Sequence, residues 1–553
     1  MSMFRLGLTS AVMALGSLAI FFSPTCIAQT AGGEIPPAQF QIAGTVVSTA
    51  GGGVLARARV TIRDARNLKD VQSVLTGGDG RFEFHVRRGK YALQGAKRGF
   101  ITSDYDQHEQ YSSAIVTGSG LDTEGVVLKL APSAVLSGRI LDESGDPVRG
   151  AEVSLWREDH STGVSRITRY RRDVADDQGT YEFTPLDGGT YFLSASATPW
   201  YAVHPASTAP EGGVLIPTVV DRGLDVVYPT TYYVGATESD DASPIPIRAG
   251  DRLELDLHLV PLAALHVVFR SQPSAENVYP MPRLQKRIFD GFDQPRGQEN
   301  VQMISPGVFE LTTAPGKYAV HLVGPGGNGR INEVDIAQNH QEVDTSSGEA
   351  GSSVNVSVHV QGEDAIPREL FLGLRDEQRR GSNFQQVSSQ GEVAFGNVAP
   401  GTYELVAGSR NDTYSVVRIT SDGHETSGHT LGVPAGSSLT VSLTLVAGTG
   451  RVEGLAKRAG KAVAGAMVVL IPKHPEANRD LFRRDQSDLD GSFLLQNVIP
   501  GTYTVIAIAD GWDLDWSRPG VISKYASHGQ TIMVPGQGRH SIQLPESVEV
   551  QAK

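Results

Sequence analysis

The residue types best suited to binding chemistry lie in one short segment near the C-terminus. Trp512, Asp513, Asp515 and Trp516 set two indoles beside two carboxylates. Flat aromatic rings stack on the faces of pyranose sugars, and carboxylate oxygens accept hydrogen bonds from sugar hydroxyls. We therefore predict that these four residues form a carbohydrate-binding site.

A structural explanation competes for some of the candidate indoles. Phe100, Trp200 and Trp512 each follow a tyrosine by nine residues, so they share one recurring position. Such a position is expected in the core or at the rim of a repeated domain. Trp200 with Tyr201 is nevertheless a second candidate platform for sugars. Trp516 has no counterpart elsewhere in the chain, so we expect it to be the principal ligand contact.

Motifs for catalysis and for metal binding are missing from the sequence. None of the 14 histidines begins an H-E-x-x-H pair, and no G-x-S-x-G elbow or P-loop is present. Asp485, Asp488 and Asp490 could supply oxygen ligands to calcium, but a tight turn explains them equally well. We expect no catalytic residue, no metal and no cofactor. A hydrolase with an unrecognised site remains an alternative.

The elements that must position these residues belong to an internal repeat. Five times, a glycine precedes an alternating apolar segment, and a second glycine with a tyrosine two residues later follows it. The first glycine and the tyrosine are 11, 12, 11, 12 and 12 residues apart in Gly80/Tyr91, Gly179/Tyr191, Gly307/Tyr318, Gly391/Tyr403 and Gly491/Tyr503. Such regularity indicates one supersecondary unit used five times.

Each part of the unit has a physical role. Alternation such as Phe82 and Phe84 puts one face of a strand in a core. The acidic residues before the first glycine favour a tight turn with that glycine at positive φ. The tyrosine begins a second strand, and we expect its ring to pack inside while its hydroxyl reaches a backbone group, as in the tyrosine corner. We predict no chemistry for these tyrosines.

Three copies extend the pattern upstream and reveal a family resemblance. Gly44, Gly138 and Gly454 open apolar segments before Ala58, Ala151 and Ala466. These copies resemble the carboxypeptidase regulatory-like domain, a transthyretin-like β-sandwich, and less closely the collagen-adhesin B-type module. The resemblance covers most of residues 38–548 and implies a fold class that often binds carbohydrate. The catalytic zinc domain of the carboxypeptidases is absent from this chain.

The predicted fold is an all-β tandem array of about five Ig-like or transthyretin-like β-sandwiches after a signal peptide. We place the sandwiches at 38–131, 132–262, 263–350, 351–447 and 448–548, the third and fourth being divergent. Alternating segments at 126–130, 253–259, 439–445 and 542–544 are expected to be the last strands of their domains. Short connections between domains predict a semi-rigid row.

The N-terminal segment predicts export. Arg5 precedes an apolar stretch that ends near Pro24, and small residues around Ala28 suit cleavage, so residues 1–28 are predicted to be a signal peptide. Cys26, the only cysteine, would be removed with it, which excludes disulfide scaffolds and thiolate metal sites. No other segment is apolar for the length of a membrane span. We expect a secreted, periplasmic or cell-envelope protein.

Composition narrows the possible partners. Loss of Arg5 leaves 47 basic and 61 acidic residues, a net charge of −14, which disfavours nucleic acid. The 62 glycines and 30 prolines fit a turn-rich fold of many strands. We predict an exported, non-catalytic carbohydrate-binding or adhesive protein whose partner is a polysaccharide. A spacer or scaffold for a protein of the cell envelope is the alternative.

Overall fold

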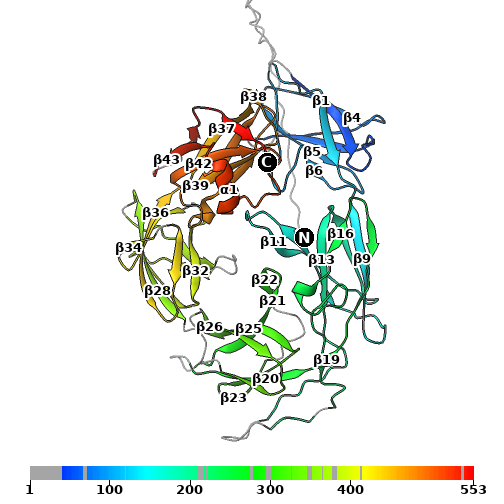
Figure 1. Cartoon of the computed structure of the whole chain (residues 1–553), viewed down its shortest axis with the longest axis vertical. Helices are drawn as coiled ribbons and strands as arrows, with labels where there is room; N and C mark the ends of the chain where they lie inside the picture. Colours follow the sequence, from blue (N-terminus) through cyan, green and yellow to red (C-terminus); the bar gives the residue numbers. More distant parts are fainter. Residues whose placement is uncertain are drawn as a thin grey trace, which may run out of the picture.

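The fold is an array of five units built almost entirely of strands; four have two sheets each, and the nine strands of the fifth join in one sheet through β45. The computed structural model describes residues 40–65, 71–118, 120–208, 216–219, 221–273, 278–293, 301–324, 327–344, 351–363, 365–376, 383–410, 414–426, 428–536 and 541–553. We name the five units sandwich 1 to sandwich 5 in chain order (Figure 1). The predicted all-β tandem array is confirmed.

Sandwiches 1 and 2 take up the first 18 strands, apart from β14. Sandwich 1 contains β1 (Phe40–Ser48), β2 (Arg59–Asp64), β3 (Gln72–Leu75), β4 (Arg81–Val86), β5 (Lys90–Ala96), β6 (Ser103–Asp104), β7 (Ile115–Val116) and β8 (Val126–Leu130). Sandwich 2 contains β9 (Ala134–Leu141), β10 (Glu152–Asp159), β11 (Arg166–Val174), β12 (Thr180–Leu186), β13 (Gly189–Ser196), β15 (Thr231–Tyr232), the 3₁₀ turn η1 (Ser239–Asp241), β16 (Ile245–Ile247), β17 (Arg252–Glu254) and β18 (Leu257–His258). A separate two-stranded sheet, β14 (Val226–Val227) with β19 (Leu262–Ala263), lies between sandwiches 2 and 3.

The remaining strands form sandwiches 3, 4 and 5. Sandwich 3 contains β20 (Leu265–Arg270), β21 (Met281–Ile288), β22 (Gly291–Asp293), β23 (Gln302–Ser305), β24 (Val308–Thr313), β25 (Gly316–Gly324), β26 (Gly327–Ile336) and β27 (Gln341–Asp344). Sandwich 4 contains β28 (Ser352–Gln361), β29 (Phe371–Asp376), β30 (Asn383–Gln386), β31 (Glu392–Val398), β32 (Gly401–Gly408), β33 (Tyr414–Ser421), β34 (His424–Glu425), β35 (Thr430–Val433) and β36 (Ser438–Ala447). Sandwich 5 contains β37 (Gly450–Arg458), β38 (Lys461–Ala462), β39 (Met467–Pro472), η2 (Arg479–Leu481), β40 (Arg483–Gln486), β41 (Ser492–Val498), β42 (Gly501–Ile508), the helix α1 (Pro519–Ala526), β43 (Gln530–Val534), β44 (Ser541–Gln543) and β45 (Val548–Gln551).

All five sandwiches share one pairing scheme. The first strand pairs antiparallel with the strand that follows the first repeat glycine, and parallel with the last strand or its two parts. The strand that contains the repeat tyrosine pairs antiparallel with the second strand. The predicted last strands at 126–130, 253–259, 439–445 and 542–544 lie in those closing positions, so the repeat in sequence is a repeat in topology.

The recurring glycines upstream of the repeat are required by close packing inside three sandwiches. A Cβ on Gly138 would lie 1.9 Å from the carbonyl oxygen of Leu255, in the neighbouring closing segment. Gly44 meets the same obstacle at 2.0 Å from the carbonyl oxygen of Val126. A Cβ at Gly454 would lie 2.5 Å from the ring of Phe493. No side chain fits at this place, which explains why glycine recurs there.

The repeat glycine and the repeat tyrosine behave as predicted. All five first glycines lie at φ between 71° and 85°, where a Cβ would be strained. Each of the five tyrosine hydroxyls donates to the backbone carbonyl four residues before it, over 2.7 to 3.0 Å, in the pairs Tyr91/Arg87, Tyr191/Asp187, Tyr318/Ala314, Tyr403/Ala399 and Tyr503/Ile499. The tyrosine-corner role is confirmed in every copy.

The expectation of a row of sandwiches is wrong, because the chain closes on itself. Sandwich 5 packs against sandwich 1, and its loop before α1 also contacts sandwich 2 (Figure 1). Short connections were expected to make the array rigid, and they do restrict each joint. The restricted joints turn the chain through a closed circuit rather than along a line, which no local pattern encodes.

Polar contacts between neighbouring sandwiches restrict the joints. At the joint between sandwiches 2 and 3, the ammonium of Lys286 in sandwich 3 donates to Glu238 of sandwich 2 over 2.9 Å. At the joint between sandwiches 4 and 5, the amide of His429 donates to Asn478 over 3.0 Å. Between sandwiches 3 and 4, β26 lies against β31.

Two further sequence expectations concern helices and the N-terminus. The helix α1 was not predicted, although Pro519 occupies the first turn, where proline is favoured. The predicted signal peptide, residues 1–28, lies outside the described residues. Within the described ranges, no helix is both long enough and apolar enough to cross a membrane.

Candidate functional site

The four residues predicted to bind carbohydrate lie on the loop between β42 and α1, where sandwich 5 meets sandwiches 1 and 2. Trp516 is only 6% exposed, and its indole N–H donates to the carbonyl of His160 in sandwich 2 over 3.3 Å. The ring of Trp512 stacks on His108 of sandwich 1 at a centroid distance of 5.1 Å. The loop therefore brings the two indoles to contacts between sandwiches.

The two carboxylates on this loop already have protein partners. Asp515 accepts the backbone N–H of Ser165 in sandwich 2 over 2.9 Å and forms an ion pair with Arg518, also at 2.9 Å. Asp513 forms an ion pair with Lys553, whose ammonium lowers the pKa of that exposed carboxyl. Hydroxyl groups of a sugar would have to compete with these partners.

A guanidinium covers one face of the predicted sugar platform. Arg484 of β40 lies 4.3 Å from the ring centroid of Trp516 and 5.3 Å from that of Tyr111 in sandwich 1. Its side chain is 2% exposed and forms a two-pronged ion pair with Glu109, at 2.6 and 3.3 Å. Carbohydrate binding by Trp512, Asp513, Asp515 and Trp516 stays a prediction, and their geometry supports a role in closing the chain.

Of the three aspartates considered for calcium, Asp488 contacts sandwich 1, whereas Asp485 and Asp490 bond within sandwich 5. Asp488 binds Lys90 of sandwich 1 at 2.6 Å and accepts the backbone N–H of Ala114 at 2.8 Å. Asp485 accepts the N–H of Leu494, and burial raises the pKa of Asp485 to about 7. The described residues contain no cluster of His, Cys, Asp and Glu that could hold a metal ion.

Of the aromatic side chains that the structure describes, Trp200 is the most open to solvent. It is 88% exposed, against 6% for Trp516. It follows β13 in a turn in which the N–H of Ala202 donates to the carbonyl of Pro199 over 3.0 Å. Tyr201 meets the indole edge-on, at 5.7 Å and 85°. Most of the indole surface is thus accessible to a ligand.

Hydrogen bonds anchor the segment that carries Trp200. Tyr201 and Tyr228 both donate their hydroxyls to the carboxylate of Glu143, the latter over 2.9 Å. Burial and the adjacent carboxylate raise the pKa of Tyr201 to about 12 and also raise the pKa of Tyr228. Burial alone would raise the pKa of Glu143, but hydrogen bonds from the two phenols lower it, and the pKa stays below its ordinary value. Both phenols therefore stay protonated and keep the platform in place.

Sequence reasoning noticed Trp200 but favoured Trp516, because position in the repeat does not determine exposure. At the same position, Phe100 packs against the core of sandwich 1, and Trp512 packs against a cluster in sandwich 5. Trp200 alone of the three projects into solvent. No sequence pattern indicated the role of Arg484, because its partner Glu109 is 375 residues away in the chain.

Comparisons with known proteins do not assign the chain to a family. No protein-family model and no curated protein matches the chain. Among solved structures, the Bacillus anthracis TIE protein aligns over 74% of each chain, with 11% identity and a TM-score of 0.18. The shaft pilin SpaA of Lactobacillus rhamnosus GG aligns over 41% of this chain and 99% of its own, with 11% identity and a TM-score of 0.19. The minor pilin GBS52 of Streptococcus agalactiae aligns over 40% and 96%, with 12% identity and a TM-score of 0.19.

Superposition scores this low carry no argument about function. The β-sandwich repeat is established by the strand pairing of this chain itself. The resemblance to the carboxypeptidase regulatory-like domain stays a prediction.

Proposed function

We propose that this is an exported, non-catalytic carbohydrate-binding or adhesive protein, and that Trp200 is its sugar platform. The observation that carries the proposal is the 88% exposure of an indole whose supporting segment is held by Glu143, Tyr201 and Tyr228. Solvating so much apolar surface is unfavourable unless a partner covers it. An indole held in a fixed orientation loses little entropy on binding.

A pyranose sugar fits the platform because it combines an apolar face with polar hydroxyls at its edge. The C–H-rich face of a pyranose can lie on the indole, while the hydroxyls at its rim reach polar groups. Glu143 is exposed beside Tyr201, and a carboxylate has more acceptor positions than two phenols occupy. Sandwich 2 thus offers a stacking surface at Trp200 and a hydrogen-bond acceptor at Glu143.

The closed chain supports a compact binding protein rather than an extended spacer. A spacer separates its two ends, whereas here sandwich 5 contacts sandwich 1 directly. Exposed Val203 and Leu224, whose backbones pair near Trp200, would extend the contact area for a polymer. Export rests on the predicted signal peptide, residues 1–28.

Polysaccharide pull-down and a glycan array with the purified mature chain would test this function. We expect at least one polysaccharide to bind and the Trp200→Ala variant to lose at least tenfold in affinity. Phe384→Ala is the matched control, because Phe384 is a 50% exposed aromatic in sandwich 4. Trp516→Ala tests the site predicted from sequence.

Two outcomes would contradict the proposal. If no glycan binds the wild-type chain, carbohydrate binding is wrong. If glycans bind but Trp200→Ala equals wild type, the platform lies elsewhere, and a selective loss in Trp516→Ala would return the site to the segment 512–516. Recovery of one stable protein partner by crosslinking in cells, with no glycan bound, would favour the scaffold alternative.

A further inference from the structure

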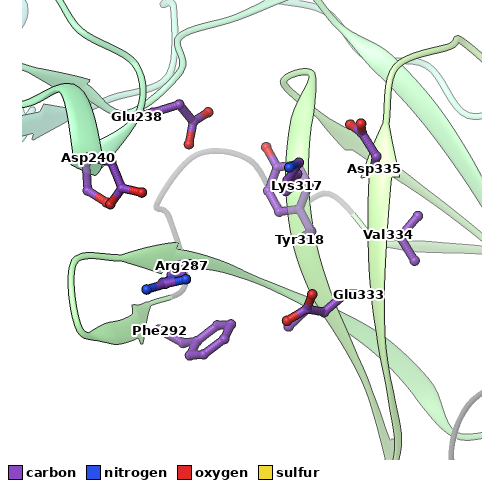
Figure 2. A pocket seen from close by; sticks show the side chains of 11 residues that line it. Glu238, Asp240, Arg287, Phe292, Lys317, Tyr318, Glu333, Val334 and Asp335 are labelled. Atoms are coloured by element: carbon purple, nitrogen blue, oxygen red, sulfur yellow. The ribbon is translucent and has the colours of Figure 1, made fainter.

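A pocket lies at the joint between sandwiches 2 and 3, and Trp200 is not among the residues that line it. Its volume is about 470 Å³, within the range of small-molecule sites. Figure 2 shows Glu238 and Asp240 of sandwich 2 on one side, and Arg287, Phe292 and Lys317 of sandwich 3 across from them. The proposed sugar platform does not use this pocket.

The residues of sandwich 3 that line the pocket lie in one row across neighbouring strands. Arg287 of β21 pairs with Phe292 of β22, and Lys317 of β25 pairs with Asp335 of β26. Lys286 of β21 pairs with Tyr318 of β25, and Arg287 and Lys317 are the next positions along these two strands. Directly opposed residues share a face of the sheet. Because Lys286 and Tyr318 are buried, this row lies on the outer face.

The wall from sandwich 2 is held in place before any ligand arrives. Lys286 is 3% exposed, and its ammonium donates to Glu238 and to the carbonyl of Thr237, both over 2.9 Å. The N–H of Phe289 donates to the hydroxyl of Ser239 over 2.9 Å. The Phe289 ring packs among three aromatic rings of sandwich 2, those of Trp156, Phe192 and Tyr232. The pocket is therefore preformed across the joint.

Charges of both signs line this preformed pocket. Arg287 and Lys317 are cations on neighbouring strands, each one position beyond the Lys286–Tyr318 pair, and both line the pocket. Carboxylates flank them on both sides, with Asp240 on the sandwich 2 wall and Glu333 and Asp335 on β26. Phe292 closes one end of the row with an apolar ring.

We propose that this pocket binds a zwitterionic amino-carboxylate, that is, an α-amino acid or a terminal residue of a peptide. The ligand carboxylate lies between Arg287 and Lys317, whose guanidinium and ammonium can both donate hydrogen bonds to it. The ligand ammonium faces the carboxylate wall at Asp240, and the ligand side chain packs on Phe292. A ligand of one sign would leave the opposite set of pocket charges desolvated without a partner.

The test uses four ligands that share the leucine side chain and differ in charge, with the full-length mature chain. Leucine carries both charges, N-acetylleucine only the negative one, leucinamide only the positive one, and N-acetylleucinamide neither. Isothermal titration should show binding of leucine and at least tenfold weaker binding of the three blocked compounds. The dipeptides leucylglycine and glycylleucine, and longer peptides that end in leucine, then decide between a free amino acid and a peptide terminus.

Variants connect the binding to the pocket. Lys317→Met should weaken binding of leucine at least tenfold, and Asp240→Asn should weaken it more than it weakens N-acetylleucine. Lys129→Met, at an exposed position of β8 in sandwich 1, is the matched control and should bind like wild type. Circular dichroism confirms that each variant is folded.

Three results would overturn the proposal. The first is equal binding of leucine and N-acetylleucinamide, which would show an apolar or neutral site. The second is unchanged binding in both folded pocket variants. The third is no heat and no thermal shift with any of the free or peptide ligands at millimolar concentration. None of these results bears on glycan binding at Trp200.

Discussion

The ion pair between Arg484 and Glu109 should control whether the chain stays closed. The Arg484 side chain is 2% exposed, and its two bonds to Glu109 are 2.6 and 3.3 Å long. Removing one partner of a buried pair leaves an uncompensated buried charge, at a cost of ~3 to 5 kcal/mol. Glu109 is 23% exposed, so water would screen part of this charge. For Glu109→Gln we expect about 3 kcal/mol, or roughly a 150-fold shift from closed towards open.

Two measurements follow the closure separately from unfolding. Small-angle X-ray scattering reports the larger radius of gyration of an opened chain. Energy transfer between dyes on sandwiches 1 and 5 reports the junction itself. Cysteines introduced at Lys129 and Lys461 would carry the dyes, and a chain without residues 1–28 has no other cysteine to react.

A double-mutant cycle and a surface control make the test specific. Arg484→Met alone should also loosen the junction, but combined with Glu109→Gln it should cost less than the sum, because no unpaired charge remains. Glu342→Gln removes one partner of the Arg270–Glu342 pair, which is more than half exposed, and should change closure by less than about 1 kcal/mol. Unchanged scattering and energy transfer in Glu109→Gln would refute the reasoning. A cycle with strictly additive effects would refute the role of the ion pair.

Three further predictions concern single sandwiches. Replacing Tyr503 by Phe removes one hydrogen bond to the backbone and should destabilise sandwich 5 by ~1 kcal/mol in chemical denaturation; a negligible loss would refute the corner role. Gly138→Ala should destabilise sandwich 2 by about 1 to 3 kcal/mol, because the methyl would meet the Leu255 carbonyl, whereas Gly432→Ala, with open space around it, should cost far less. The pKa of Asp485 is about 7 in the folded chain and near 3.8 when unfolded, so the folded chain binds the extra proton and stability should fall as pH rises from about 4 to 7. Asp485→Asn, which resembles the protonated acid, should flatten that slope in unfolding titrations, and an unchanged slope would contradict the buried-acid assignment.

Local chemistry explains why so much of the fold could be predicted. A turn with glycine at positive φ and an alternating strand each depend on only a few neighbouring residues. The structural roles of Gly80 and Phe82 could therefore be predicted from the sequence around them. The tyrosine corner likewise spans four residues, as Tyr191 and Asp187 show. Gly138 could be recognised as part of a sequence pattern. The carbonyl of Leu255, which leaves no room for a side chain at Gly138, lies more than 100 residues away in the chain.

The candidate site could be predicted only in part, since its properties depend on exposure. Trp200 and Trp512 occupy one repeat position, yet one is open to solvent and the other stacks on His108. Their equal spacing from the repeat tyrosine does not distinguish them. The difference arises because sandwich 1 covers Trp512 and no described element covers Trp200 in the same way.

The sequence by itself therefore determined the unit, its five-fold repetition and the turns and corner bonds inside it, because these depend on contacts between near neighbours in the chain. Only the tertiary structure decided that the array closes, that Trp516 lies beneath Arg484, and that charges from two sandwiches line one pocket. Those features depend on the combined orientations of the sandwiches at four successive joints. A small change in orientation at one joint displaces every sandwich after it, so the final arrangement depends on the whole molecule.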